Sequence, residues 1–168
     1  MKTVAIAVII VLFALSAAAQ KNFYNQEFKV GFKVPASGRS AKDPFSGPDP
    51  KMKTIETISF KGSSGIPASF ADVFAGTMTK DECSALSDGF TIKPRSMKYG
   101  STRFTMTQET SPGMESEAPQ QHYTTYHDGA CYEVTFSIPE QRHTKHKYNE
   151  NAGFARMRPI LSTMYFRR

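Results

Sequence analysis

The stretch from Gln121 to Ile138 reads QHYTTYHDGACYEVTFSI, and the predicted fold is built around it. Two alternating runs meet at Asp128-Gly129, a dipeptide typical of type I′ hairpin turns, whose two central residues both need positive φ. A two-residue turn fixes the register, so Tyr126 should face Cys131 and His122 should face Thr135. The predicted core face holds Tyr123, Tyr132, Val134, Phe136 and Ile138, and the outer face holds His122, Thr124, Tyr126, Cys131 and Glu133.

The N-terminal segment, residues 1–19, has the three parts of an export signal. Lys2 supplies the positive end, an apolar stretch follows, and Ala17 to Ala19 supply the small residues of a cleavage site. The apolar stretch is shorter than the about 20 residues that a membrane anchor needs. We therefore expect residues 20–168 to be exported as one domain without an anchor, to a periplasm or to the outside of the cell.

Cys83 and Cys131 are the two cysteines of the chain. In an oxidising compartment an isolated pair usually forms a disulfide, which here would close a long loop and contribute on the order of 3–4 kcal/mol. Two buried, unpaired thiols are the alternative. A metal site is disfavoured because neither cysteine belongs to a closely spaced ligand pair. We expect the bridge to tie the segment around Cys83 to the outer face of the hairpin.

The rest of the chain predicts an α+β domain with further strands. Phe28 to Val34 alternates and ends at Pro35, and residues 54–60 and 102–108 also have strand character. Residues 36–53 are rich in Ser, Gly, Pro and Lys and predict a long surface loop. Residues 69–75 space Phe70, Val73 and Phe74 as one face of a short helical turn.

Two further helices are expected. Thr79 should cap a helix from Lys80 to about Leu86, with acidic residues in its first turn. Asn149 or Asn151 should cap a C-terminal helix that bends or restarts at Pro159, because a proline inside a helix removes a hydrogen bond. Residues 163–166 then form a last strand.

This order of elements resembles that of PsbP-like domains. The run Phe23-Tyr24-Asn25-Gln26-Glu27-Phe28-Lys29-Val30-Gly31-Phe32 looks like their opening, and the hairpin, helix and closing residues 160–166 are similar to their end. Residues 36–100 depart from the pattern, and the chain lacks the tryptophan that many members carry near the first proline. The resemblance implies an antiparallel sheet flanked by helices, and mostly non-catalytic binding or assembly roles. No functional residue of the family maps onto this chain.

Motifs of catalysis and of cofactor binding are absent from the sequence, which contains no nucleophile elbow, phosphate loop, zinc-protease motif or Cys-x-x-Cys pair. We therefore expect no cofactor. His143 and His146 are three residues apart, but the cations around them disfavour a metal ion, so we expect no metal site. The pI is near 9.3, yet export and the lack of a groove-reading motif exclude nucleic acid as a partner.

Candidate binding residues come from three features. Arg156 and Arg158 lie in a basic C-terminal region that either attracts anions or is only a solvated face. Tyr126, with Tyr24 and Tyr165, is a candidate for lining an apolar groove. His122 and Glu133 should approach diagonally on the outer face of the hairpin, as a surface polar pair or as an acid–base pair.

Three classes of function follow. The first is an exported, non-catalytic binding or accessory module with a protein partner in the cell envelope or outside the cell. The second is a carrier or sensor of a small or anionic ligand that uses the 36–53 loop and the basic C-terminal segment. The third is an enzyme with an unrecognised site, for which His122, Glu133 and His127 are the candidates.

Overall fold

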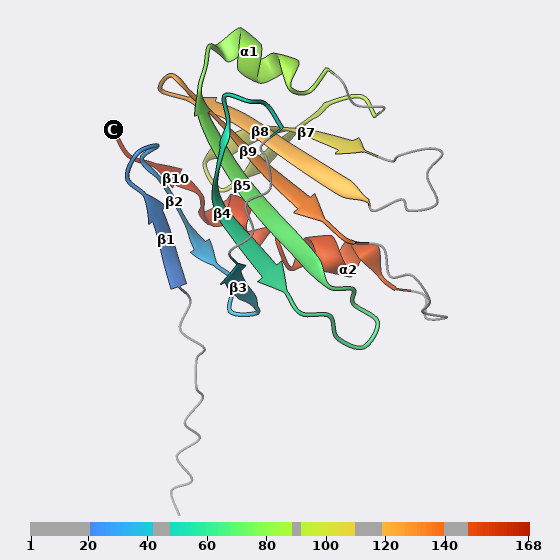
Figure 1. Cartoon of the computed structure of the whole chain (residues 1–168). Helices are drawn as coiled ribbons and strands as arrows, with labels where there is room; N and C mark the ends of the chain where they lie inside the picture. Colours follow the sequence, from blue (N-terminus) through green and yellow to red (C-terminus); the bar gives the residue numbers. More distant parts are fainter. Residues whose placement is uncertain (1–20, 42–47, 89–91, 110–118, 140–147) are drawn as a thin grey trace, which may run out of the picture.

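The computed structural model describes residues 21–41, 48–88, 92–109, 119–139 and 148–168, which form a single α+β domain (Figure 1). The expected export signal and the His143–His146 pair lie outside these residues. A seven-stranded antiparallel sheet has the order β3-β4-β5-β9-β8-β7-β6, and a small sheet has the order β1-β2-β10. The strands of the large sheet are β3 (Gly38–Ala41), β4 (Lys53–Phe60), β5 (Ser69–Thr77), β6 (Arg95–Tyr99), β7 (Thr102–Glu109), β8 (Gln120–His127) and β9 (Ala130–Ser137). The small sheet contains β1 (Lys21–Asn25), β2 (Val30–Val34) and β10 (Tyr165–Phe166).

The hairpin at the centre of the prediction is β8–β9. Asp128 and Gly129 have φ angles of 46° and 82°, as a type I′ turn requires. The register is the predicted one, with Tyr126 opposite Cys131 and His122 opposite Thr135. Turn chemistry alone therefore placed every side chain of this hairpin on its correct face.

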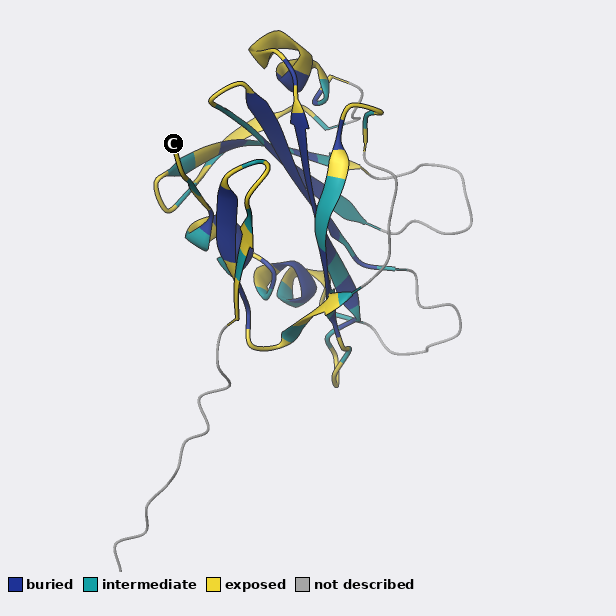
Figure 2. Cartoon of the chain, turned by 60° about the vertical axis from the view of Figure 1, so that its left-hand side comes forward, coloured by how far each residue is buried: buried dark blue, intermediate teal, exposed yellow. Residues whose placement is uncertain are grey.

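The main core lies between the inner face of the large sheet, the small sheet and the two C-terminal helices (Figure 2). The helices are α2 (Glu150–Ala155) and α3 (Pro159–Thr163), and Asn149 caps α2 through its side chain. The helix restarts at Pro159, as predicted, because proline is tolerated in a first helical turn. Val30 and Phe32 of β2 and Phe154, Met157, Ile160 and Leu161 of the helical segment are almost fully buried against the sheet.

A second, smaller apolar cluster lies on the opposite, outer face of the sheet. Helix α1 (Lys80–Ala85) packs there, and Thr79 and Glu82 form the capping box at its N-terminus. The predicted disulfide joins Cys83 of α1 to Cys131 of β9, with the Cα atoms 5.5 Å apart. Met52, Phe74 and Met78 complete this cluster. The outer face is therefore partly covered.

The prediction of a helical turn at residues 69–75 is wrong, because these residues belong to β5. This strand pairs with β4 and β9, so it lies inside the sheet. Its Val73 packs in the main core while Phe70 and Phe74 point to the outer face. A short apolar run that is buried on both faces lacks the alternation of a half-buried strand, and its spacing also fits a helix.

Besides β5, three strands were not predicted. Strands β1 and β6 are short and lie at sheet edges, and β3 interrupts the segment that was expected to be a loop at 36–53. Each is largely exposed, so its sequence carries little hydrophobic pattern. Residues 42–47 of the expected loop lie outside the described residues.

Candidate functional site

A row of five polar side chains crosses the outer face of the large sheet. Consecutive pairings of β4, β5, β9, β8 and β7 put these side chains opposite one another, so they share one face. All five are less than a tenth exposed. We call this set the polar row, and it consists of Thr57, Asp72, Thr135, His122 and Thr107.

Glu133 joins the polar row through hydrogen bonds. The Nδ1 atom of His122 lies 2.9 Å from the Oε1 atom of Glu133 and 3.2 Å from the Oγ1 atom of Thr135. The Thr135 hydroxyl donates to the same Glu133 oxygen at 3.0 Å. The side chain of Glu133 is 1% exposed, so its carboxylate is held by side chains and not by bulk water.

Other members of the row differ in how they are satisfied. The Thr57 hydroxyl donates to the Oδ1 atom of Asp72 at 2.7 Å. The Nε2 atom of His122 lies 4.0 Å from the Oε2 atom of Glu109. Within the described part of the chain, the buried hydroxyl of Thr107 has no hydrogen-bond partner. A buried polar group in this state costs about 1–3 kcal/mol, so the row is not optimised for stability alone.

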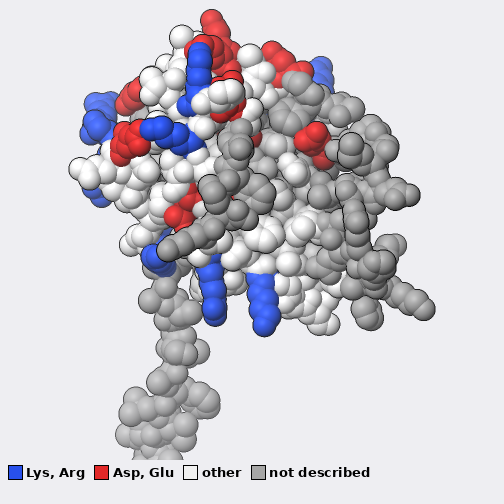
Figure 3. Space-filling view, in the orientation of Figure 1, with Lys and Arg blue, Asp and Glu red and all other residues white. Residues whose placement is uncertain are grey.

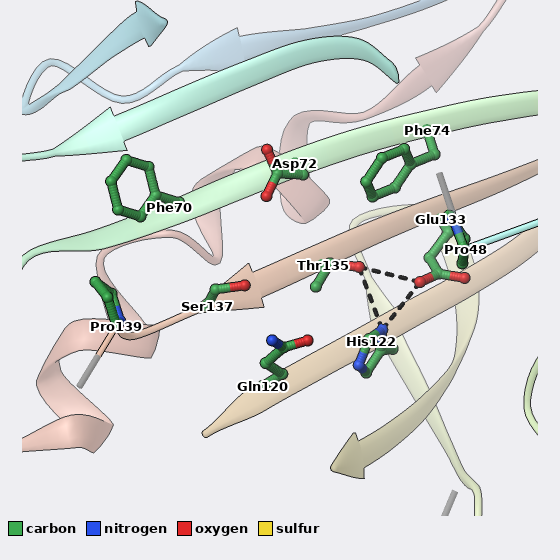
Figure 4. A pocket seen from close by; sticks show the side chains of 10 residues that line it. All are labelled: Pro48, Phe70, Asp72, Phe74, Gln120, His122, Glu133, Thr135, Ser137 and Pro139. Atoms are coloured by element: carbon green, nitrogen blue, oxygen red, sulfur yellow. Dashed lines mark hydrogen bonds and ion pairs between the residues drawn. The ribbon is translucent and has the colours of Figure 1, made fainter. Parts of the chain in front are cut away.

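A cavity of about 370 Å³ opens over this row (Figure 4). We call it the His122 cavity. Its apolar walls include Phe70 and Phe74 of β5, which project on either side of Asp72 (Figure 4). Its remaining described lining consists of Pro48, Gln120, His122, Glu133, Thr135, Ser137 and Pro139. Apolar walls with a few convergent polar groups are typical of ligand sites, and this volume falls within their usual range.

His122 and Glu133 are together, as predicted, but they do not lie on an exposed surface. Their diagonal approach follows from the register, whereas their burial follows from the covering of the outer face, which the sequence did not indicate. His127 does not join them, because it lies an odd number of residues from His122 and therefore on the other face of β8. Its ring packs on Phe166 instead, with centroids 4.6 Å apart.

Arg156 does not line this cavity and is used within the fold. Its guanidinium donates to the backbone oxygens of Phe60, Lys61 and Pro67 and to the hydroxyl of Ser69. Burial lowers the pKa of Arg156 from its ordinary value. These contacts tie α2 to both ends of the β4–β5 connection, which leaves few donors for an external anion.

Arg158 and Tyr126 also occupy separate places. Arg158 interacts with the hydroxyl of the buried Tyr123, on the inner-face side of the sheet. Tyr126 lies on the outer face beside α1, in a second cavity that does not include His122. The structure therefore does not bring Arg156, Arg158, Tyr126 and His122 into one site.

The charge distribution over the visible surface is mixed. In Figure 3, basic and acidic side chains are interspersed over the upper part of the face, and only basic ones are seen along its lower edge. In the C-terminal segment, Arg167 stacks over the rings of Tyr24 and Tyr165.

Among the described residues, no group of three or more His, Cys, Asp or Glu side chains is arranged to hold a metal ion. In the same residues, no helix has the length and apolar character needed to cross a membrane.

The order of the strands, the two C-terminal helices and the small second sheet define the class: a single α+β domain with a PsbP-like fold. The chain aligns with the solution structure of cyanobacterial PsbP (CyanoP) from Synechocystis sp. PCC 6803 at a TM-score of 0.53 and 9% identity, over 92% of this chain and 96% of that one. The resemblance inferred from the two ends of the sequence is thus confirmed at the level of the fold.

Two other solved structures are similar. The Ran-binding protein Mog1p of Saccharomyces cerevisiae aligns at a TM-score of 0.52 and 9% identity, over 88% of this chain and 95% of that one. A crystal structure from Bacteroides thetaiotaomicron VPI-5482 aligns at a TM-score of 0.56 and 11% identity, over 89% of this chain. The chain spans about half of that protein, 49% of its length. No family model and no curated protein sequence matches this chain.

The residues of the His122 cavity that the sequence interpretation missed include Asp72, Phe70 and Phe74 of β5. Residues 69–75 were interpreted as helical, and a helix would not place these three side chains on one face with His122. The interpretation therefore did not predict them as part of this site. The available signal was Asp72 itself, a charged residue within an otherwise apolar run. A buried carboxylate in such a run usually has a specific partner.

Proposed function

We propose that the protein is an exported, non-catalytic binding or accessory module, and that the His122 cavity is its binding site. The observation that carries the proposal is the combination of apolar walls with a buried, hydrogen-bonded cluster of Glu133, His122 and Thr135 at the base of an open cavity. Such a cluster is costly to bury and contributes directional hydrogen bonding to whatever enters the cavity.

Export is part of the proposal and has two supports. Residues 1–19 have the pattern of a cleaved signal, and the Cys83–Cys131 disulfide fits an oxidising compartment. A protein partner in the cell envelope or outside the cell is one occupant of the cavity, through an inserted side chain. Mog1p, which shares the fold, is described as Ran-binding, so this fold is compatible with a protein-binding role.

The geometry of the His122 cluster favours binding over catalysis. Among the described residues, the hydroxyl of Thr135 hydrogen-bonds His122, and it lies beside the same ring nitrogen that faces Glu133. In a nucleophilic triad the carboxylate and the hydroxyl contact opposite nitrogens of the imidazole, so that one orients the ring and the other is activated. Here both contact Nδ1, which orients the ring without activating Thr135.

A carrier of a small ligand is the second candidate function. Its support is the cavity volume of about 370 Å³, which is within the range of sites for small organic molecules. The described lining contains two carboxylates, Asp72 and Glu133, and no lysine or arginine. An anionic ligand is therefore disfavoured in this cavity, and a neutral or cationic ligand with an apolar body fits it better.

The test is to isolate the protein from the exported fraction of its own source and to measure its native mass and its co-purifying proteins. Ser137→Phe narrows the His122 cavity from the end of β9, and Ser101→Phe, in an exposed turn, is the matched control. We expect a bound molecule or a specific partner with the wild type and with the control, and its loss with Ser137→Phe. A bare wild-type chain, or equal occupancy in all three proteins, would contradict the proposal.

A further inference from the structure

The outer face carries a second cavity, of about 230 Å³, between α1 and the strands β6, β7 and β8. We call it the α1 cavity. From the helical side, its lining includes Lys80, Cys83, Ser84 and Ser87. From the sheet, it includes Ser96, Arg103, Phe104, Thr105, Thr124, Thr125 and Tyr126. Its volume is below the range of about 300–1,000 Å³ usual for larger organic ligands, so a small group suits it.

Hydroxyl groups line the sheet side of the α1 cavity in register. Ser96 pairs with Thr105, and Thr105 pairs with Thr124, so their side chains form a line across three strands on the outer face. Thr124 is 6% exposed and Thr105 is half-buried. Side-chain hydroxyls can rotate to donate, so neighbouring members of this line can present O–H donors to the cavity.

Ser87 provides the observation that points to a ligand. It lies just after α1, is 5% exposed and lines the cavity. Within the described residues its hydroxyl has no hydrogen-bond partner. An unpaired buried hydroxyl is destabilising, so its presence needs an explanation other than the stability of the empty fold.

The charged residues of the α1 cavity are cations. Lys80 and Arg103 face it from opposite sides, one from α1 and one from β7, and its described lining includes no carboxylate. One of the two acids of α1, Glu82, is engaged outside the cavity: the ammonium of Lys51, followed by hydrogen bonds from Thr79, lowers the pKa of Glu82 to about 2. Opposed cations and several hydroxyl donors make a set that is complementary to an anion with several acceptor oxygens.

We propose that the α1 cavity binds a small tetrahedral oxyanion, a phosphate or sulfate group, between Lys80 and Arg103, with Ser87 and Thr124 donating hydrogen bonds to it. This site is separate from the His122 cavity and does not depend on the function proposed for that cavity. The phosphate or sulfate is either a free ion or the charged group of a larger molecule that extends past the half-buried Tyr126 into solvent.

The test is calorimetric titration of the disulfide-bonded protein with inorganic phosphate, sulfate and glycerol phosphate, each against sodium chloride of equal ionic strength. We expect saturable binding of phosphate or sulfate with a dissociation constant of about 1 mM or below. Arg103→Gln and Lys80→Gln should weaken it about tenfold or more, because each removes a charge-assisted hydrogen bond. Arg39→Gln, at an exposed position on β3, is the matched control and should bind as the wild type does.

Ser87→Ala separates a ligand role from a structural one. If the hydroxyl serves the oxyanion, this variant should bind phosphate more weakly while its unfolding midpoint without phosphate stays equal or rises. Tighter binding of glycerol phosphate than of the free ions would identify a larger ligand, and equal binding would identify the ion. The proposal fails if no oxyanion binds saturably, or if Arg103→Gln and Arg39→Gln have equal effects.

Discussion

Removing the Cys83–Cys131 disulfide should lower the stability of the domain by an amount that the loop length predicts. The two cysteines are 48 residues apart, and the chain-entropy expression for a loop of this length gives about 4 kcal/mol at 25 °C. In a domain of this size, that loss corresponds to a fall in the unfolding temperature of about 10–15 °C. The chain has no tryptophan, so guanidinium denaturation is followed by far-ultraviolet circular dichroism and tyrosine fluorescence.

Two proteins separate the cross-link from the side chains. The reduced wild type keeps both sulfur atoms in the cluster with Met52, Phe74 and Met78, whereas the double variant Cys83→Ala/Cys131→Ala also loses their contacts. The reduced protein should therefore lose about 4 kcal/mol, and the double variant should lose more. If the free energies of unfolding of the reduced and oxidised proteins differ by less than about 1 kcal/mol, the loop-entropy argument is refuted. The reduced, unfolded chain would then already be restricted without the disulfide.

Two further changes test other parts of the fold. Arg156→Lys should destabilise the domain by about 2 kcal/mol in chemical denaturation, because a lysine cannot reach all four oxygens that the guanidinium contacts. The control Arg95→Lys, on exposed β6, should change the free energy of unfolding by less than about 0.5 kcal/mol. Equal effects of the two substitutions would contradict a structural role for Arg156. Burial raises the pKa of Tyr123 and Tyr132, so the unfolded state should release these protons first and stability should fall as the pH rises above about 10. Absorbance at 295 nm should show that both phenols ionise only on unfolding, and Tyr123→Phe should reduce the loss of stability at alkaline pH. Ionisation of all seven tyrosines in the folded protein would contradict this prediction.

Local chemistry in the sequence predicted those elements whose geometry is set by a few neighbouring residues. Asp128-Gly129 specifies its turn through positive φ, and Thr79 with Glu82 specifies a helix start through reciprocal hydrogen bonds. These interactions need no information from distant parts of the chain. The same holds for Asn149 and Pro159, which set the two C-terminal helix starts.

Elements whose structure depends on distant partners were predicted poorly. The sequence of β5 is an apolar run that fits either period, and only pairing with β4 and β9 makes it a strand. Strands β1, β3 and β6 have few buried side chains, so their own residues carry no strong pattern. Each of them is a strand because it pairs with the neighbouring strand of its sheet. The local sequence does not show which strand that neighbour is.

The candidate site depends on the same distinction. Alternation along the hairpin correctly separated its two faces, and it predicted His122 beside Glu133. It could not indicate that these side chains would be buried, because the residues around them come from distant segments, including the misassigned strand β5. A surface pair of His and Glu is weakly coupled, whereas the same pair at 7% and 1% exposure forms a stiff, oriented cluster.

Burial of polar side chains on the second face of the sheet also constrains why they are there. An antiparallel sheet can bury one face in the core and leave the other face in water. Threonines and carboxylates on a face in water pay no free energy of desolvation. Instead the fold places α1 and a disulfide over one end of the outer face and leaves the buried hydroxyls of Thr107 and Ser87 without partners among the described residues. Ser87 lines the α1 cavity, Thr107 pairs in register with His122, and the Oε1 atom of Glu56 is a third such atom, away from the described lining of both cavities. The oxyanion proposed for the α1 cavity would supply the missing partner of Ser87, because binding adds hydrogen bonds that the empty fold lacks.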